Sequence, residues 1–189
     1  MTLIELVDNR LTDKNTSHSY LDTYEKMFQN KKDKDVNLLE VGIYGGGSMK
    51  LWSEYFANGK IYGVDVRPYN YATDSAIRNK KNVKLFVDTN AYDLEFINKQ
   101  FSETKFDFLI DDGSHLLQDM LFFVEHYSAL LKDDGILIVE DVQKWEWIES
   151  LKERTPEHLK KYMRVIDLRD VKHQYDDVLF VIDKAGIFA

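Results

Sequence analysis

The strongest constraint on the fold is the alternation of short apolar runs with longer amphipathic segments. The runs occupy residues 37–43, 60–66, 83–87, 106–111, 135–140, 164–168 and 178–183. Segments with helical periodicity lie between most of them, for example Leu117–Leu131 and Val142–Leu159. Apolar strands that alternate with amphipathic helices form a parallel sheet covered on both faces. We therefore predict an α/β protein.

The last two apolar runs differ from the others in how they are joined. Only Arg169–Asp177 separates them, which is too short for a helical crossover, so we expect an antiparallel pair at one edge. The prediction is a seven-stranded, mostly parallel sheet with the last strand antiparallel. A helix over residues 17–29 indicates an N-terminal helical segment, residues 1–30, which packs on a core formed by residues 31–189 as a single domain.

Composition restricts the kinds of partner and the cellular compartment that we expect for the protein. The formal net charge of −8 disfavours nucleic acid, because a polyanion would be repelled. The absence of cysteine rules out disulfides and thiolate metal sites. Without an apolar run long enough for a signal peptide or a bilayer span, we expect a cytoplasmic protein that does not associate with membranes. The apolar N-terminal helix can support a homodimer or a higher homo-oligomer.

A glycine-rich loop follows the first strand, which should be central. Ligands of such sheets bind beyond the carboxyl ends of the strands. Glycines let the backbone approach a ligand, and the next helix, which we expect Ser48 to cap, offers free N–H groups. Asp65 ends the second strand, where an acid can accept hydrogen bonds from a ribose. The candidate cofactor residues here are Glu40, Gly42, Tyr44, Gly45, Gly47, Ser48 and Asp65.

The loop does not have the spacing of a dinucleotide site. The pattern G-x-G-x-x-G fails from Gly42 because Tyr44 replaces the second glycine, and from Gly45 because Lys50 replaces the third. Glu40 would also repel a pyrophosphate. S-adenosylmethionine (SAM) carries an amino group, a sulfonium and a ribose but no phosphate, so acids suit it. We therefore predict a SAM site, in which Asp88 contacts the adenine amino group and Asp111 is a further member. Tight-turn glycines and turn-capping aspartates are the alternative.

Acidic residues also end the fourth and fifth strands. Asp112 follows one of these strands, and Glu140 and Asp141 follow the other, so three carboxylates should meet at one rim. They repel one another unless a cation neutralises them, and oxygen ligands favour Mg²⁺ or Mn²⁺. His115 lies three residues beyond Asp112, where a neutral imidazole can accept a proton from a hydroxyl. The alternatives are that Asp141 caps a helix starting near Val142 and that His115 is structural.

Four segments together resemble a known family, the macrolide-sugar O-methyltransferases of the mycinamicin type. They are E-V-G-I-Y-G-G-G-S-x-x-x-W (Glu40–Trp52), I-Y-G-V-D (Ile61–Asp65), I-D-D-G-S-H (Ile110–His115) and V-E-D (Val139–Asp141), and the N-terminal T-D-K-N-T-S-H-S-Y is similar as well. The resemblance implies a Rossmann-like class I methyltransferase fold, SAM as methyl donor and Mg²⁺. It also implies Asp112, Glu140 and Asp141 as metal ligands, His115 as the base and Asp65 on the ribose.

Two features of the resemblance affect the substrate. His18 and Tyr20 match family positions, so they either close over SAM or the acceptor or pack on the core. Family members that act on macrolides carry additional segments, so we expect a sugar or another small-molecule or glycoconjugate hydroxyl as acceptor. The predicted function is a metal-assisted, SAM-dependent O-methyltransferase. The alternatives are an NAD(P)-type oxidoreductase and a non-catalytic SAM-binding protein.

Overall fold

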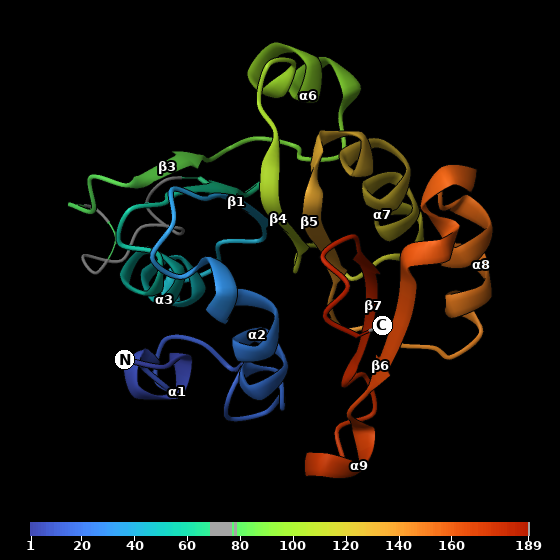
Figure 1. Cartoon of the computed structure of the whole chain (residues 1–189), viewed down its shortest axis with the longest axis horizontal. Helices are drawn as coiled ribbons and strands as arrows, with labels where there is room; N and C mark the ends of the chain where they lie inside the picture. The colour runs from blue at the N-terminus through green and yellow to red at the C-terminus, as the bar shows by residue number, and fades with distance from the viewer. Residues whose placement is uncertain (69–76, 78, 189) are drawn as a thin grey trace.

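The sheet follows the predicted plan in a computed structural model, which describes residues 1–68, 77 and 79–188 (Figure 1). Its strand order is β3-β2-β1-β4-β5-β7-β6. The first five strands in the chain run parallel to one another, and β7 runs antiparallel to both neighbours. The seven-stranded, mostly parallel sheet is therefore confirmed. The strands are β1 (Asn37–Val41), β2 (Lys60–Val64), β3 (Val83–Phe86), β4 (Phe106–Asp111), β5 (Leu131–Val139), β6 (Met163–Asp167) and β7 (Val178–Asp183).

The antiparallel pair at the end of the chain is confirmed, but its order in the sheet is not the order in the sequence. β7 inserts between β5 and β6, so that Phe180 is in register with Val139 on one side and Val165 on the other. β6 is therefore the edge strand. This order explains why β7 is buried along its whole length while β6 is only partly buried.

Helices cover both faces of the sheet, and the alternation of side chains along each strand supplies both cores. In β4, Phe108 and Ile110 point to one core, and Leu109 points to the other. The first core contains residues of α1 (Leu3–Leu6), α2 (Leu21–Phe28) and α3 (Gly47–Tyr55). The second contains residues of α6 (Leu94–Phe101), α7 (Leu117–Phe122) and α8 (Trp147–Arg154).

The helices that precede and follow β5 are shorter than the periodicity predicts. The helix expected over Leu117–Leu131 is α-helical only to Phe122, continues as a wider π-helical turn and a 3₁₀ turn, and gives way to β5 at Leu131. The next helix, α8, begins at Trp147 with Glu146 at its N-cap position. The alternative in which Asp141 caps a helix near Val142 is therefore wrong. A short helix, α9 (Arg169–Lys172), joins β6 to β7.

The N-terminal segment packs against the sheet. Tyr24 and Phe28 of α2 are fully buried and pack with Trp52 of α3, and Phe28 also contacts Phe108 of β4. The apolar face of α2, which suggested a homodimer, is thus already covered within the chain, and the homodimer stays a prediction. No helix in residues 1–68, 77 and 79–188 is long and apolar enough to cross a membrane.

Candidate active site

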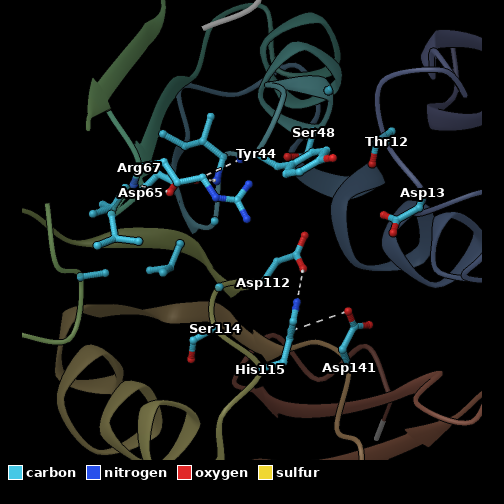
Figure 2. Close-up of a pocket in the computed structure, with 18 of the residues that line it drawn as sticks. Thr12, Asp13, Tyr44, Ser48, Asp65, Arg67, Asp112, Ser114, His115 and Asp141 are labelled. Atoms are coloured by element: carbon cyan, nitrogen blue, oxygen red, sulfur yellow. Dashed lines mark hydrogen bonds and ion pairs between the residues drawn. The ribbon is translucent and has the colours of Figure 1, made fainter. Parts of the chain in front are cut away.

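A cavity of about 550 Å³ lies at the carboxyl ends of β1, β2 and β4 (Figure 2). This is the place where ligands of open α/β sheets bind. Residues 9–13 and 16 of the N-terminal segment form one of its walls. The described lining comprises Asn9, Arg10, Leu11, Thr12, Asp13, Thr16, Val41, Gly42, Ile43, Tyr44, Gly47, Ser48, Val64, Asp65, Val66, Arg67, Asn90, Ala91, Tyr92, Asp112, Gly113, Ser114, His115 and Asp141.

Two glycines of the loop allow segments of the chain to meet at this cavity. Gly42 has a φ of +93°, and a Cβ added there would lie 1.9 Å from the carbonyl oxygen of Asp112. A Cβ on Gly47 would lie 2.0 Å from the carbonyl oxygen of Leu11. Both glycines line the cavity, whereas Gly45 lies outside its described lining and faces open space. The first two positions therefore require glycine for packing between backbone segments.

Asp65 connects the ends of β1 and β2. One carboxylate oxygen accepts hydrogen bonds from the N–H groups of Ile43 and Tyr44 at 2.9 and 3.0 Å, and the other accepts from the N–H of Arg67 at 2.8 Å. Tyr44, which has a φ of 46°, is exposed and stacks under the Arg67 guanidinium at 5.0 Å. Asp65 thus fixes the loop conformation and still borders the cavity, where the ribose role stays a prediction.

Glu40 lies beneath the cavity and is completely buried. Its Oε2 accepts hydrogen bonds from Ser48 Oγ at 2.7 Å and from Trp52 Nε1 at 3.0 Å. Burial raises the pKa of Glu40 to about 7, although the nearby Lys14 lowers it. The expected N-cap role of Ser48 is wrong, because Gly46 is the N-cap of α3 and the Ser48 hydroxyl is used by Glu40.

Lys14, which the sequence did not single out, lies in the middle of the acidic residues. Its ammonium donates to Asp112 Oδ2 at 2.7 Å and to both Glu140 oxygens at 2.7 and 2.6 Å, and it lies 3.3 Å from Glu40 Oε1. The side chain is 1% exposed. Tyr24 also donates to Glu140. Burial and the surrounding carboxylates raise the pKa of Glu140 well above its usual range, even though Lys14 opposes the shift.

His115 lies between Asp112 and Asp141 at the rim of the cavity, as Figure 2 shows. Its Nε2 is 3.9 Å from Asp112 Oδ1, and its Nδ1 is 3.7 Å from Asp141 Oδ2. Nδ1 is buried and has no hydrogen-bond partner among the described residues. His115 and Asp141 both have a backbone φ of 54°. Residues other than glycine rarely adopt this conformation, and it recurs at functional sites.

The remaining predicted residues lie around this center. Asp111 is buried below the cavity, where it accepts a hydrogen bond from Tyr92 at 2.7 Å, and burial raises its pKa to about 7. Asp88 is exposed and lies outside the described lining of the cavity. The cofactor roles of both residues stay predictions.

His18 and Tyr20 hold the strand ends from the N-terminal side. Tyr20 is fully buried and donates to Asp141 Oδ1 at 2.5 Å, while His18 Nδ1 is 2.9 Å from Asp177 Oδ1. Both residues therefore pack on the core, which is the second of the two expectations for them. By fixing one oxygen of Asp141, Tyr20 leaves the other oxygen on the His115 side.

The acidic residues form two overlapping groups whose donor atoms lie within 4.8 Å of one another. One group is Asp112, His115 and Asp141, and the other is Glu40, Asp112 and Glu140. The three predicted metal ligands are therefore divided between the two groups: Glu140 is in one, Asp141 is in the other, and Asp112 belongs to both. Carboxylates outnumber the one ammonium between them, and buried Glu40 Oε1 has no hydrogen bond within the described structure. This excess of oxygen donors fits a hard divalent cation.

Comparison with known proteins identifies the class to which this fold and site belong. Residues 39–142, more than half of the chain, match the model of a methyltransferase domain family, and the chain belongs to that family. The family distinguishes the chain from the NAD(P)-type oxidoreductase considered above. The resemblance to macrolide-sugar O-methyltransferases is also confirmed.

Two similar curated proteins illustrate that resemblance. The 8-demethyl-8-alpha-L-rhamnosyl tetracenomycin-C 2'-O-methyltransferase of Streptomyces olivaceus is 28% identical over 143 residues, which cover 72% of this chain and 36% of that protein. The mycinamicin VI 2''-O-methyltransferase of Micromonospora griseorubida is 25% identical over 138 residues, covering 69% and 33%. The chain spans about a third of the length of these relatives.

Solved structures agree with the class I methyltransferase fold. The MycE methyltransferase of the mycinamycin biosynthetic pathway, in complex with Mg, SAH and mycinamycin VI, superposes with a TM-score of 0.74 at 21% identity, covering 97% of this chain and 53% of that one. Methanococcus jannaschii fibrillarin superposes with a TM-score of 0.59 at 17% identity, covering 80% and 68%. At these identities the likeness is one of fold.

Proposed function

We propose that the chain is a SAM-dependent O-methyltransferase that acts, with the help of Mg²⁺, on a hydroxyl of a sugar or another small-molecule or glycoconjugate acceptor. The observation that carries the proposal is the placement of His115 between two carboxylates at the rim of a cavity whose other wall holds Asp65 and the glycine loop. The names of the curated relatives, which are sugar O-methyltransferases, support the reaction class. The net charge of −8 supports a small acceptor over a nucleic acid.

Different residues of the cavity bind SAM and take part in the methyl transfer. Asp65 accepts hydrogen bonds from the ribose of SAM, and the loop of Gly42–Ser48 lies along the donor. His115 receives the proton of the acceptor hydroxyl at Nε2, because Nδ1 is buried against Asp141. The hydroxyl oxygen forms a bond to the methyl carbon as the bond from that carbon to sulfur breaks, so S-adenosylhomocysteine and a protonated His115 result.

Asp112, Glu140 and Asp141 would hold the divalent cation. Bound there, Mg²⁺ supplies Lewis-acid chemistry that lowers the pKa of a nearby hydroxyl. The chain's own contribution is orientation. Tyr20 fixes one oxygen of Asp141, and Gly42 allows the backbone of β1 to approach that of Asp112, so both acids stay beside His115.

The test is transfer of a labelled methyl group from SAM to a panel of acceptors, comprising deoxysugar glycosides, catechols and RNA, with Mg²⁺ and with a chelator. We expect label on a glycoside hydroxyl, and less of it in the chelator. Tight SAM binding without transfer to any acceptor would instead support the non-catalytic SAM-binding protein. Label on RNA would overturn the acceptor class.

A further inference from the structure

The ammonium of Lys14 occupies the point at which Asp112 and Glu140 converge. It lies 2.6–2.7 Å from Asp112 Oδ2 and from both oxygens of Glu140. Lys14 comes from the N-terminal segment, whereas Asp112 and Glu140 directly follow β4 and β5 and are 98 and 126 positions away in the sequence. The contact is therefore a tertiary one that only the folded chain creates.

A divalent cation that bridged Asp112 Oδ2 and Glu140 would need the same position. Mg²⁺ binds oxygen at about 2.0–2.1 Å. An ion held by both carboxylates would therefore overlap the position that the ammonium of Lys14 occupies. Two cations so close repel each other strongly in a buried site. Lys14 and a bridging ion therefore exclude each other.

The charge around Lys14 shows that a divalent ion suits this position chemically. Three carboxylates, those of Glu40, Asp112 and Glu140, surround one ammonium. Glu40 is completely buried, and its Oε1 points to Lys14 at 3.3 Å without a hydrogen bond from the described residues. When all three acids are ionised, a single positive charge leaves the group with a net negative charge.

We propose that Lys14 and a divalent cation are alternative occupants of the position between Asp112 and Glu140, beside Glu40, so that the lysine competes with the metal. The inference rests on the metal-assisted form of the proposed function. Because Leu11, Thr12, Asp13 and Thr16 flank Lys14 and line the cavity, the exchange also moves one wall of the site. Metal occupancy is thereby linked to the position of the N-terminal segment.

The first test measures Mn²⁺ binding by electron paramagnetic resonance, with the full chain carrying Lys14→Met. Removing a like charge from the position should tighten Mn²⁺ binding by about tenfold or more. The matched control is Lys31→Met, which removes another buried lysine that pairs with Asp107 and Asp134 and should leave Mn²⁺ binding unchanged. Equal or weaker binding in a folded Lys14→Met protein would overturn the inference.

The second test needs no variant, so it applies even if Lys14→Met fails to fold. Amine acetylation of the wild-type chain is followed by mass spectrometry with and without saturating Mg²⁺. We expect Lys14, which is 1% exposed, to react only in the presence of Mg²⁺, and Lys31 to be unaffected. Continued protection of Lys14 in protein shown to bind Mg²⁺ would contradict the exchange.

The two proposals fail in different ways. If the wild-type chain transfers methyl groups with Mg²⁺ but Lys14→Met binds Mn²⁺ no more tightly, the competition is wrong and the proposed function stands. If Lys14→Met binds Mn²⁺ more tightly than the wild-type chain does, but the wild-type chain transfers methyl groups equally well in the chelator, the competition stands and metal assistance of the transfer is wrong.

Discussion

Two lysine–carboxylate clusters lie at opposite ends of β4. At the carboxyl end, Lys14 faces Glu40, Asp112 and Glu140. At the amino end, Lys31 and Lys132 face Asp107, and Lys31 also pairs with Asp134. The clusters use the same chemical groups, but only the amino-end cluster has as many lysines as carboxylates.

The difference in charge balance predicts that one cluster is structural and the other functional. At the amino end, the hydrogen bond from Lys31 lowers the pKa of Asp134. At the carboxyl end, burial raises the pKa of Glu40 to about 7 despite Lys14. Perturbed acids in a cavity are typical of sites that bind or react. The amino-end cluster should therefore serve stability, and the carboxyl-end cluster should serve chemistry.

The largest expected effect comes from His115→Gln at the carboxyl end. Removing the base should reduce turnover by about 10²–10⁴-fold, while SAM affinity and the unfolding temperature stay close to wild type. Labelled-methyl transfer and calorimetric titration with SAM measure the two properties. The control is His158→Gln, which changes an exposed histidine. Normal turnover in His115→Gln would show that another group takes the proton.

At the amino end, Lys31→Met should reduce stability and leave turnover per folded molecule unchanged. Asp107 is buried, and breaking a buried pair costs about 3–5 kcal/mol. We expect the free energy of unfolding, measured in urea, to fall by about 3 kcal/mol. The loss should be at the low end of the range because Lys132 and the N–H of Asn37 still donate to Asp107.

The control for that variant is Lys152→Met. It breaks an exposed pair with Glu149, which should contribute about 1 kcal/mol or less. Equal stability losses in the two variants would remove the distinction between a buried structural cluster and a surface pair.

A smaller effect is expected at the cavity wall from Asp65→Asn. The substitution removes a charged acceptor for the N–H groups of Ile43 and Tyr44. It also removes the proposed acceptor for the ribose, so SAM should bind about 10–100-fold more weakly. Asp88→Asn is the matched control, because Asp88 is exposed and lies outside the described cavity lining. A larger loss of SAM affinity in Asp88→Asn than in Asp65→Asn would indicate that Asp88 contacts the adenine and contributes more to SAM binding than Asp65 does.

The sequence allowed prediction of the parts of the molecule that depend on local patterns. The strands could be predicted because apolar runs such as Phe106–Asp111 are buried on both faces. The strand ends also predicted that Asp112 and Asp141 line one cavity, whereas Glu140 is buried outside its described lining. The position of β7 between β5 and β6 could not, because strand order is set by packing between distant segments.

Within the site, Lys14 is a residue that local sequence patterns could not identify. It is separated from Asp112 by 98 positions and from Glu140 by 126. A single lysine in a polar N-terminal stretch has no periodicity or spacing that indicates burial. Its role follows only from the packing of α2 and α3, which brings the segment before α2 against Glu40. Long-range ion pairs of this kind require the folded chain.

The smallest expected effect is the pH dependence of stability, which should have opposite signs at the two ends of β4. The pKa values of Glu40 and Asp111 are raised to about 7 by burial. Groups with raised pKa values stabilise the folded state at low pH, and this contribution is lost as the pH rises to about 7. The pKa of Asp134 is lowered, so its contribution is instead lost on acidification.

Metal-free protein should therefore melt at a lower temperature at pH 8 than at pH 5. We expect Tm to be a few degrees lower at pH 8, because a change of about 1 kcal/mol in the free energy of unfolding shifts Tm by about 2–4 °C in a domain of this size. Asp111→Asn should flatten the decline, since it removes one raised group, whereas Asp134→Asn should leave it intact. Mg²⁺ should restore Tm at pH 8 more than at pH 5, because the carboxylates are ionised there. A Tm that rises steadily from pH 5 to pH 8 in chelator would mean that the carboxyl-end acids are neutralised as fully as those at the amino end.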